Sequence, residues 1–142
     1  RESHKEGMFS VIYSFFCQLE KSNQIKLFKG SHGYDDGEQR RDFIHVEDTI
    51  RVKKWLMLNK VSGIFNVGTG KSRSFNDVAN NVISVLKRGD IDYIEFPDGL
   101  KEQYQAFTQA DMDNLTGSGY NNGFLSLEEG VENYVRWLEN HK

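Results

Sequence analysis

The feature that most constrains the fold of this chain is residues 41–72, in which two short apolar runs flank a helical pattern. The runs at 43–46 and 64–67 are rich in strand-forming residues, and the pattern between them places apolar side chains on one helical face, at Ile50, Val52, Trp55, Leu56 and Met57. A strand, a helix and a second strand within about thirty residues have the size of a parallel crossover unit. The stretch therefore predicts an α/β fold.

The second apolar run leads into a glycine-rich turn, Gly68-Thr69-Gly70, at the carboxyl end of the predicted strand. In open α/β sheets ligands bind at this edge. The sequence onward to Ser72 is similar to the end of a phosphate-binding P-loop. A P-loop needs a further glycine five residues before Gly70, where this chain has Phe65. We therefore reject a P-loop.

Composition and charge exclude several functional classes. The net charge of −3 and the lack of a basic stripe argue against nucleic-acid binding. No apolar run approaches the roughly 18 residues of a membrane span, and nothing resembles a signal peptide, so we expect a cytoplasmic protein that does not bind membranes. The single cysteine, Cys17, cannot form an internal disulfide, and we expect it to be buried. The histidines lack the spacing of metal ligands, so no metal site is predicted.

The remaining elements follow from periodicity and capping residues. An apolar stripe from Met8 to Leu19 predicts a helix, and strands are expected at 25–28 and 91–96. Serine followed three residues later by an acidic residue predicts helices that begin at Ser74 and Ser126, and Thr108 predicts a short one in the same way. Residues 31–41 are expected to form a polar surface loop. No linker divides the chain, so residues 1–142 are expected to form a single unit.

Several motifs resemble one enzyme family closely. The sequences RDFIHVED at 41–48 and GIFNVGTG at 63–70 look like the C-terminal half of extended short-chain dehydrogenase/reductases. More narrowly, RESHKEGM at 1–8, KLFKGS at 26–31 and YQAFTQAD at 104–111 resemble the ADP-L-glycero-D-manno-heptose 6-epimerases. The similarity covers essentially the whole chain.

The resemblance implies a fold and an activity. This family carries an N-terminal Rossmann half with a glycine-rich fingerprint and a Tyr-x-x-x-Lys pair, and neither motif occurs here. The chain is thus expected to be the C-terminal, substrate-binding half, with residues 43–88 packing on the missing nucleotide-binding domain. The complete enzyme would use NADP, bound mainly by the missing half, to invert C6 of the heptose in ADP-heptose for lipopolysaccharide core synthesis. This chain alone is expected to be inactive, and the full-length enzyme to be a homo-oligomer.

The resemblance also assigns candidate site residues. Lys5 aligns with a second acid/base group that also contacts the cofactor, although Glu6 stands where the family has a small residue. The positions that align with substrate contacts are Gly7, Ser14, Phe28, Lys29, Gly30, Ser31, Arg41 and Tyr104. Ser14 departs from the usual residue of the family.

Several of these residues could have a purely structural role instead of a role in substrate binding or catalysis. Arg41 offers a planar fork suited to phosphate oxygens, but it could equally pair with Asp35 or Asp36. Phe28 could be a core residue, and Lys5 a solvated surface lysine. A competing function is a non-catalytic module that uses the same fold to bind a nucleotide sugar or a partner chain. An in-frame Rossmann half encoded upstream would favour the enzyme.

Overall fold

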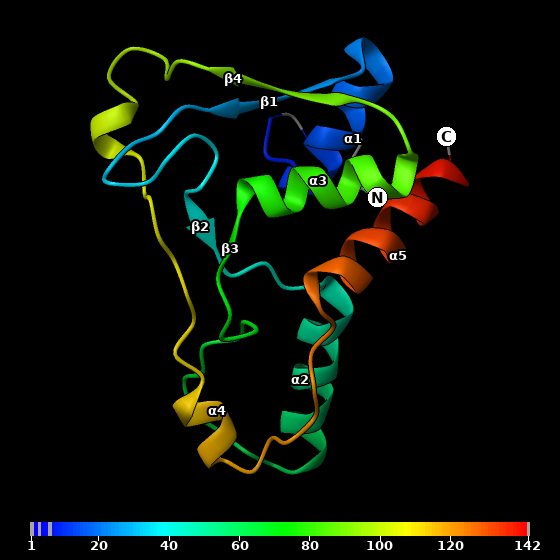
Figure 1. Cartoon of the computed structure of the whole chain (residues 1–142). Coiled ribbons are helices and arrows are strands. Elements are labelled where there is room, and N and C mark those ends of the chain that lie inside the picture. The colour runs from blue at the N-terminus through cyan, green and yellow to red at the C-terminus, as the bar shows by residue number, and fades with distance from the viewer. Residues whose placement is uncertain (1, 3, 6, 142) are drawn as a thin grey trace.

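The computed structural model describes residues 2, 4, 5 and 7–141, and its elements form two parts (Figure 1). In the first part, two parallel strands pair in register from Gln24 with Asp90 to Phe28 with Ile94, and three helices pack beside them. These elements are α1 (Val11–Ser22), β1 (Gln24–Phe28), α3 (Phe75–Leu86), β4 (Asp90–Ile94) and α5 (Leu127–Glu139). Between β1 and β4 the chain leaves the layered part and returns through α3, which leads directly into β4, so the parallel pair has a long connection that ends in a helix.

The main core lies between α1, β1, α3 and α5. Leu19, Ile25, Val82, Val131 and Val135 have no exposed surface. Since each element contributes apolar side chains at its own period, burial of one face holds the layers together. The three helices are fixed at their starts by serine N-caps.

The observed N-terminal residues of the helices can be compared with the three capping boxes predicted from the sequence. Ser74 and Ser126 each form the predicted capping box, with Asp77 and Glu129 respectively. The first helix begins later than predicted because Ser10 caps it, and Met8 lies outside it with 82% of its surface exposed. The third capping prediction is wrong. The short helix α4 (Asp113–Gly117) begins after Met112, and the Thr108 amide donates instead to the Arg40 carbonyl.

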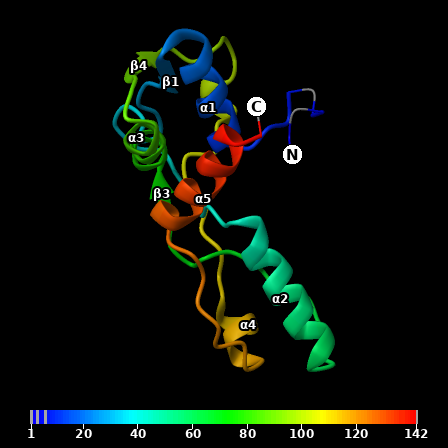
Figure 2. The same ribbon diagram turned by 90° about the vertical axis from the view of Figure 1, so that its right-hand side faces the viewer.

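The second part contains α2 (Val46–Leu58) and α4, which extend away from the layered part in both views (Figures 1 and 2). A small core of Val52, Leu115 and Tyr120 joins them. Phe65 and Val67 pack against this core, while Ile64, the residue before Phe65, is 94% exposed. The second part is therefore held by few apolar contacts.

The predicted strands at 43–46 and 64–67 are wrong. Residues 42–45 are extended without a ladder partner, α2 already begins at Val46, and residues 64–67 have the alternating burial of a strand but no partner strand. A strand needs a neighbour to satisfy its backbone groups, and neither segment has a ladder partner in the described part of the chain. The ladder at this place is formed by β2 (Arg40–Arg41) and β3 (Arg73–Ser74), which pair antiparallel, and Arg40 forms a further isolated bridge with Phe107.

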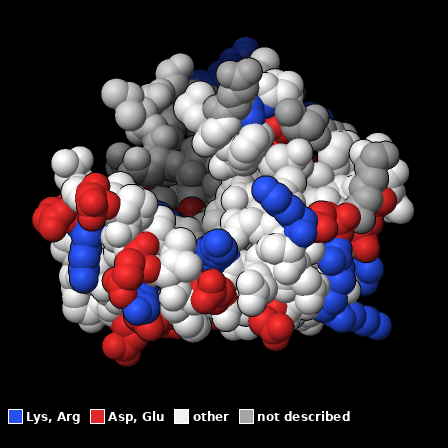
Figure 3. Space-filling view, turned by 90° about the horizontal axis from the view of Figure 1, so that it is seen from above, with Lys and Arg blue, Asp and Glu red and all other residues white. Residues whose placement is uncertain are grey.

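The surface of the molecule includes Cys17 and a mixture of acidic and basic side chains. Cys17 is exposed rather than buried. On the face seen in Figure 3, acidic and basic side chains are interspersed. Among the helices that the structure describes, none is long and apolar enough to cross a membrane.

Candidate functional site

Arg41, at the end of β2, lies against two aromatic rings. Its guanidinium carbon is 5.3 Å from the centre of the Tyr104 ring and 5.7 Å from that of Phe75. One of its N–H groups donates to the Arg40 carbonyl oxygen at 2.8 Å. Within the described chain, Arg41 forms no ion pair with Asp35 or Asp36. The rings hold the guanidinium in place while its other N–H groups stay available to an anion.

Tyr104 belongs to an aromatic cluster that faces a cavity of about 190 Å³. Phe28 stacks on Phe96 with ring centres 4.4 Å apart, and the edge of Tyr104 meets both rings. Burial raises the pKa of the Tyr104 phenol, against the opposing effect of Arg41. The phenol is therefore neutral at physiological pH and can donate a hydrogen bond. Ser14, from α1, lines the same cavity.

The segment after Phe28 turns sharply beside this cluster. The Gly30 amide donates to Asp36 Oδ1 at 2.7 Å, and a side chain at Gly30 would come within 2.6 Å of the Tyr34 carbonyl oxygen. Ser31 is 5% exposed and receives a hydrogen bond from Gln39. Lys29 points elsewhere and pairs with Glu95 at 2.6 Å, which raises the pKa of the lysine. Of Lys29, Gly30 and Ser31, the lysine directs its side chain away from this cluster, although its backbone amide donates to the Ile94 carbonyl oxygen.

The glycine-rich turn is occupied by a carboxylate of this chain. The side chain of Asp42 accepts hydrogen bonds from the Thr69 amide at 2.8 Å, the Gly70 amide at 2.9 Å and the Ala110 amide at 3.1 Å. These amides are the donors that a bound phosphate would need. The turn therefore serves as a structural joint between β2 and the segment that follows Tyr104, in agreement with the rejection of a P-loop.

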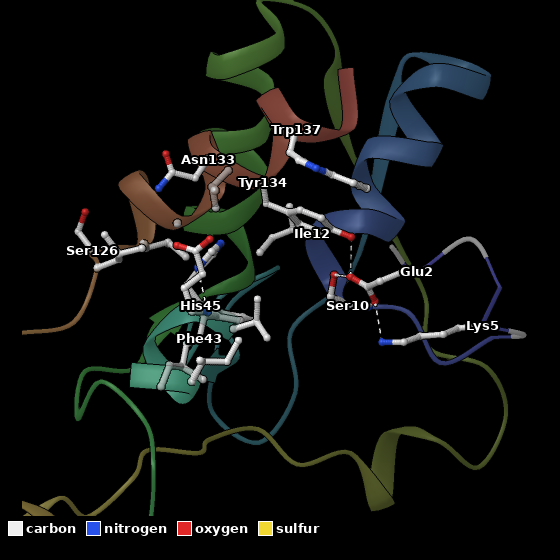
Figure 4. Close-up of a pocket in the computed structure, with 18 residues that line it drawn as sticks. Glu2, Lys5, Ser10, Ile12, Phe43, His45, Ser126, Asn133, Tyr134 and Trp137 are labelled. Carbon is white, nitrogen blue, oxygen red and sulfur yellow. Dashed lines mark hydrogen bonds and ion pairs between the residues drawn. The ribbon is translucent and has the colours of Figure 1, made fainter. Parts of the chain in front are cut away.

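Lys5 lies at a second, larger cavity of about 530 Å³ (Figure 4). Its Nζ donates to Glu2 Oε2 at 3.2 Å, and the same carboxylate accepts hydrogen bonds from Ser10 Oγ at 2.6 Å and Tyr134 Oη at 2.8 Å. Burial opposes ionisation, but the hydrogen bonds from Ser10, Tyr134 and Lys5 outweigh it and lower the pKa of Glu2 to about 2. Glu2 thus ties Lys5 to the start of α1 and to α5.

The structure separates the predicted site residues into two groups. Tyr104, Ser14 and Phe28 line the smaller cavity. Arg41 lies against the Tyr104 ring beside it, and Ser31 is hydrogen-bonded to Gln39, which also lines it. Lys5 lines the larger cavity, and Gly7 lines neither. The rings of Phe43 and Phe75 lie in contact between the two cavities, Phe43 lining the larger and Phe75 the smaller.

Sequence reasoning missed four residues that organise these cavities: Glu2, Gln39, Asp42 and Phe96. Glu2 stands three residues before Lys5, a spacing that could have suggested a pair. Asp42 was part of a recognised motif and lies beside Arg41, but its partners are 27 and 68 residues away along the chain. Gln39 lies in a polar loop, and no sequence pattern distinguishes it from its exposed neighbours.

The described residues do not build a complete cofactor or metal site. No group of three or more His, Cys, Asp or Glu side chains in the described part of the chain could hold a metal ion. A dinucleotide needs free backbone amides at a glycine-rich turn. Asp42 already occupies two of those amides, so the residues present here do not fit the pyrophosphate of a nicotinamide cofactor.

Comparison with known proteins places this geometry in context. Residues 2–68 match the sequence profile of the NAD dependent epimerase/dehydratase family. An ADP-L-glycero-D-manno-heptose-6-epimerase of Alkalilimnicola ehrlichii is 51% identical over 136 residues, which cover 95% of this chain and 42% of that protein. The crystal structure of the Helicobacter pylori ADP-L-glycero-D-manno-heptose-6-epimerase aligns with a TM-score of 0.81 and 27% identity over 98% of this chain and 40% of that one.

More distant structures share the fold alone. A UDP-N-acetylglucosamine 4-epimerase of Methanobrevibacter ruminantium M1 aligns with a TM-score of 0.79 at 22% identity, over 100% of this chain and 42% of that one. The comparisons confirm the predicted resemblance to the heptose epimerases and the predicted fold class, an α/β part of an extended short-chain dehydrogenase/reductase. The chain spans about two fifths of the length of these relatives.

Proposed function

We propose that this chain is the C-terminal, substrate-binding part of an epimerase that inverts C6 of the heptose in ADP-glycero-manno-heptose. The observation that carries the proposal is the placement of Arg41 against Tyr104 at the small cavity. A diphosphate requires a cation with several donors, and an attached base requires aromatic surface. Arg41 supplies the first, and the cluster of Phe28 and Tyr104 supplies the second. The similarity to heptose epimerases supports this choice of nucleotide sugar.

Within this proposal, Lys5 is the second acid/base group at the sugar. An epimerisation at one carbon needs proton transfer on both faces of the substrate. Lys5 is 43% exposed at the large cavity, so a substrate hydroxyl can reach it, and Glu2 fixes the direction of its ammonium. The reacting sugar would then extend from the small cavity, past Phe43 and Phe75, toward the large one.

The cofactor of the full-length enzyme is expected to be NADP, although the matching family is named for NAD. Because the glycine turn of this chain is occupied by Asp42, the dinucleotide must be bound mainly by a Rossmann half outside these residues. We propose that the exposed apolar face of α2 is the surface to which that half docks. Val46, Ile50, Met57 and Leu58 are between 56% and 80% exposed. We further expect a cytoplasmic protein that forms homo-oligomers at full length.

Calorimetric titration of the chain with ADP tests this proposal. Arg41→Ala removes the guanidinium and should weaken ADP binding by about 1.5–3 kcal/mol, the range for hydrogen bonds to charged groups, or roughly 10- to 150-fold. Tyr104→Phe removes one neutral donor and should have a smaller effect of the same kind. In the full-length enzyme both changes should appear mainly in KM, because the diphosphate is remote from the reacting carbon.

Arg136→Ala is the matched control for Arg41→Ala. It removes the same charge from the exposed side of α5, where the arginine forms only surface ion pairs. Its affinity for ADP should equal that of the unmodified chain. An Arg41→Ala variant that binds ADP as tightly as this control would exclude Arg41 from the substrate site.

A further inference from the structure

Gln39 is a buried polar side chain at the small cavity whose hydrogen-bonding capacity is only partly used. It is 1% exposed and lines the cavity together with Phe28 and Tyr104. Its amide nitrogen donates to the Lys29 carbonyl oxygen at 2.9 Å and to Ser31 Oγ at 3.2 Å. Both N–H groups of the amide are therefore engaged within the fold.

These partners fix the orientation of the Gln39 amide. The Lys29 carbonyl oxygen can only accept a hydrogen bond, so the nitrogen of the amide, and not its oxygen, must face it. The oxygen Oε1 then points away from the turn. No residue of the described chain donates a hydrogen bond to Oε1. Since Gln39 lines the cavity, this oxygen is free to accept a hydrogen bond from a ligand that enters there.

The shape of the cavity indicates which part of a ligand it takes. Its volume of about 190 Å³ is below the roughly 300–1,000 Å³ of complete small-molecule sites, so it accommodates one portion of a nucleotide sugar. Phe28 and Tyr104 offer aromatic surface, and Arg41 stands beside Tyr104 for the diphosphate. The portion that packs against aromatic rings and near a phosphate-binding cation is the base.

We infer that Gln39 determines base specificity, accepting at Oε1 a hydrogen bond from the exocyclic amino group of adenine. The inference rests on the proposed nucleotide site and adds its selectivity for the base. Gln18, which lines the same cavity, cannot play this part. Its amide donates to Ser14 Oγ at 3.2 Å and accepts from the Lys26 amide at 2.8 Å, so both ends are already paired.

Comparing ADP with inosine diphosphate in calorimetric titrations of the chain tests the inference. The two ligands share ribose and diphosphate, but inosine diphosphate has a carbonyl oxygen where adenine has its amino group, which would place two acceptors face to face. ADP should bind about tenfold more tightly or better. In Gln39→Met, which keeps the length of the side chain without the acceptor, the two affinities should agree within about twofold.

Gln18→Met is the matched control, since a purely structural loss at the cavity should weaken both ligands alike and leave their ratio unchanged. Equal affinities of the unmodified chain for ADP and inosine diphosphate would overturn the inference while leaving the nucleotide site intact, and this result needs no variant. An unchanged ratio in Gln39→Met would overturn it as well. Failure of the chain to bind ADP at all would overturn the proposed function together with the inference.

Discussion

Glu2 shows how one carboxylate can fix a reactive side chain. It accepts hydrogen bonds from Ser10, Tyr134 and Lys5, and only 12% of its side chain is exposed. Burial together with the hydrogen bond to Glu2 raises the pKa of the Tyr134 phenol, which keeps this donor protonated. The network joins the entry segment to both α1 and α5. A partly buried acid thus has a structural role and also orients a candidate catalytic lysine.

This network predicts a pH dependence of stability. The pKa of Glu2 falls from its ordinary value of 4.5 to about 2 on folding, so its stabilising contribution is complete above pH 4.5 and is lost as the pH falls toward 2. Glu2→Gln should lower the free energy of unfolding at pH 7 by about 1–3 kcal/mol and flatten its change between pH 4.5 and 2. Urea unfolding at several pH values measures both effects.

The control for this measurement is Glu132→Gln, which removes an exposed carboxylate from α5. Its unfolding free energy should follow that of the unmodified chain across the same pH range. Identical pH profiles for Glu2→Gln and Glu132→Gln would contradict the role assigned to Glu2.

Lys5 carries a second prediction at the residue scale. Lys5→Arg preserves the positive charge but cannot readily release a proton, and Lys5→Met removes both. If Lys5 transfers a proton, both variants of the full-length enzyme should lose kcat by about 10²–10⁴-fold. Epimerisation assays of purified enzyme measure this loss. If the Lys5→Arg enzyme keeps most of its epimerisation rate, Lys5 does not transfer a proton and serves only as an electrostatic contact to the substrate or cofactor.

Motif resemblance selects single residues where they are contiguous with a recognisable motif. Tyr104, Phe28 and Ser14 line one cavity, and Arg41 lies against the Tyr104 ring beside it, while the roles of all four residues stay predictions. Gln39 was missed because its role depends on a turn that brings it back to Lys29. Hydrogen bonds that close such turns produce no periodic pattern of residue types in the sequence.

At the scale of elements, the Asp42 joint connects three segments. Its carboxylate ties β2, which carries Arg41, to the glycine-rich turn and to the segment that follows Tyr104. Gly68 leaves the space for this joint. A side chain at Gly68 would lie 2.5 Å from both Asp42 Oδ2 and the Ala110 methyl group. The glycine is required here for close approach, and not for phosphate binding.

Gly68→Ala should therefore destabilise the chain. Forcing a methyl group into this packed joint should lower the free energy of unfolding by about 1–3 kcal/mol. It should also weaken ADP binding, because Arg41 and Tyr104 lose their common support. Gly123→Ala is the control, since a methyl group there meets nothing within 4 Å. Equal stability of the two variants in urea unfolding would show that the joint tolerates the added volume.

The elements also show where sequence patterns cease to be informative. Helices with capping boxes, such as α3 and α5, were predicted because all of their signals are local. The runs at 43–46 and 64–67 have the composition of strands, but strand formation depends on a neighbouring backbone that composition does not report. The pairing of β1 with β4 joins residues 66 positions apart, as Gln24 with Asp90, and could not be read from either segment.

At the scale of the whole molecule, the layered part and the extension formed by α2 and α4 differ in how much apolar surface they bury. The layered part has a continuous core, whereas α2 leaves Met57 and Leu58 exposed and Ile64 follows at 94% exposure. An apolar surface of this kind usually marks an interface. We expect it to bind the nucleotide-binding half of a longer protein.

The most direct test of the account is the mapping of ADP on the chain by amide NMR. The account predicts chemical-shift changes at Phe28, Gly30, Ser31, Gln39 and Tyr104, around the small cavity, and unchanged signals for Thr69 and Gly70, whose amides donate to Asp42. Shifts concentrated at Thr69 and Gly70, with the signals around the small cavity unchanged, would place the phosphates in the glycine-rich turn and contradict the proposed substrate site.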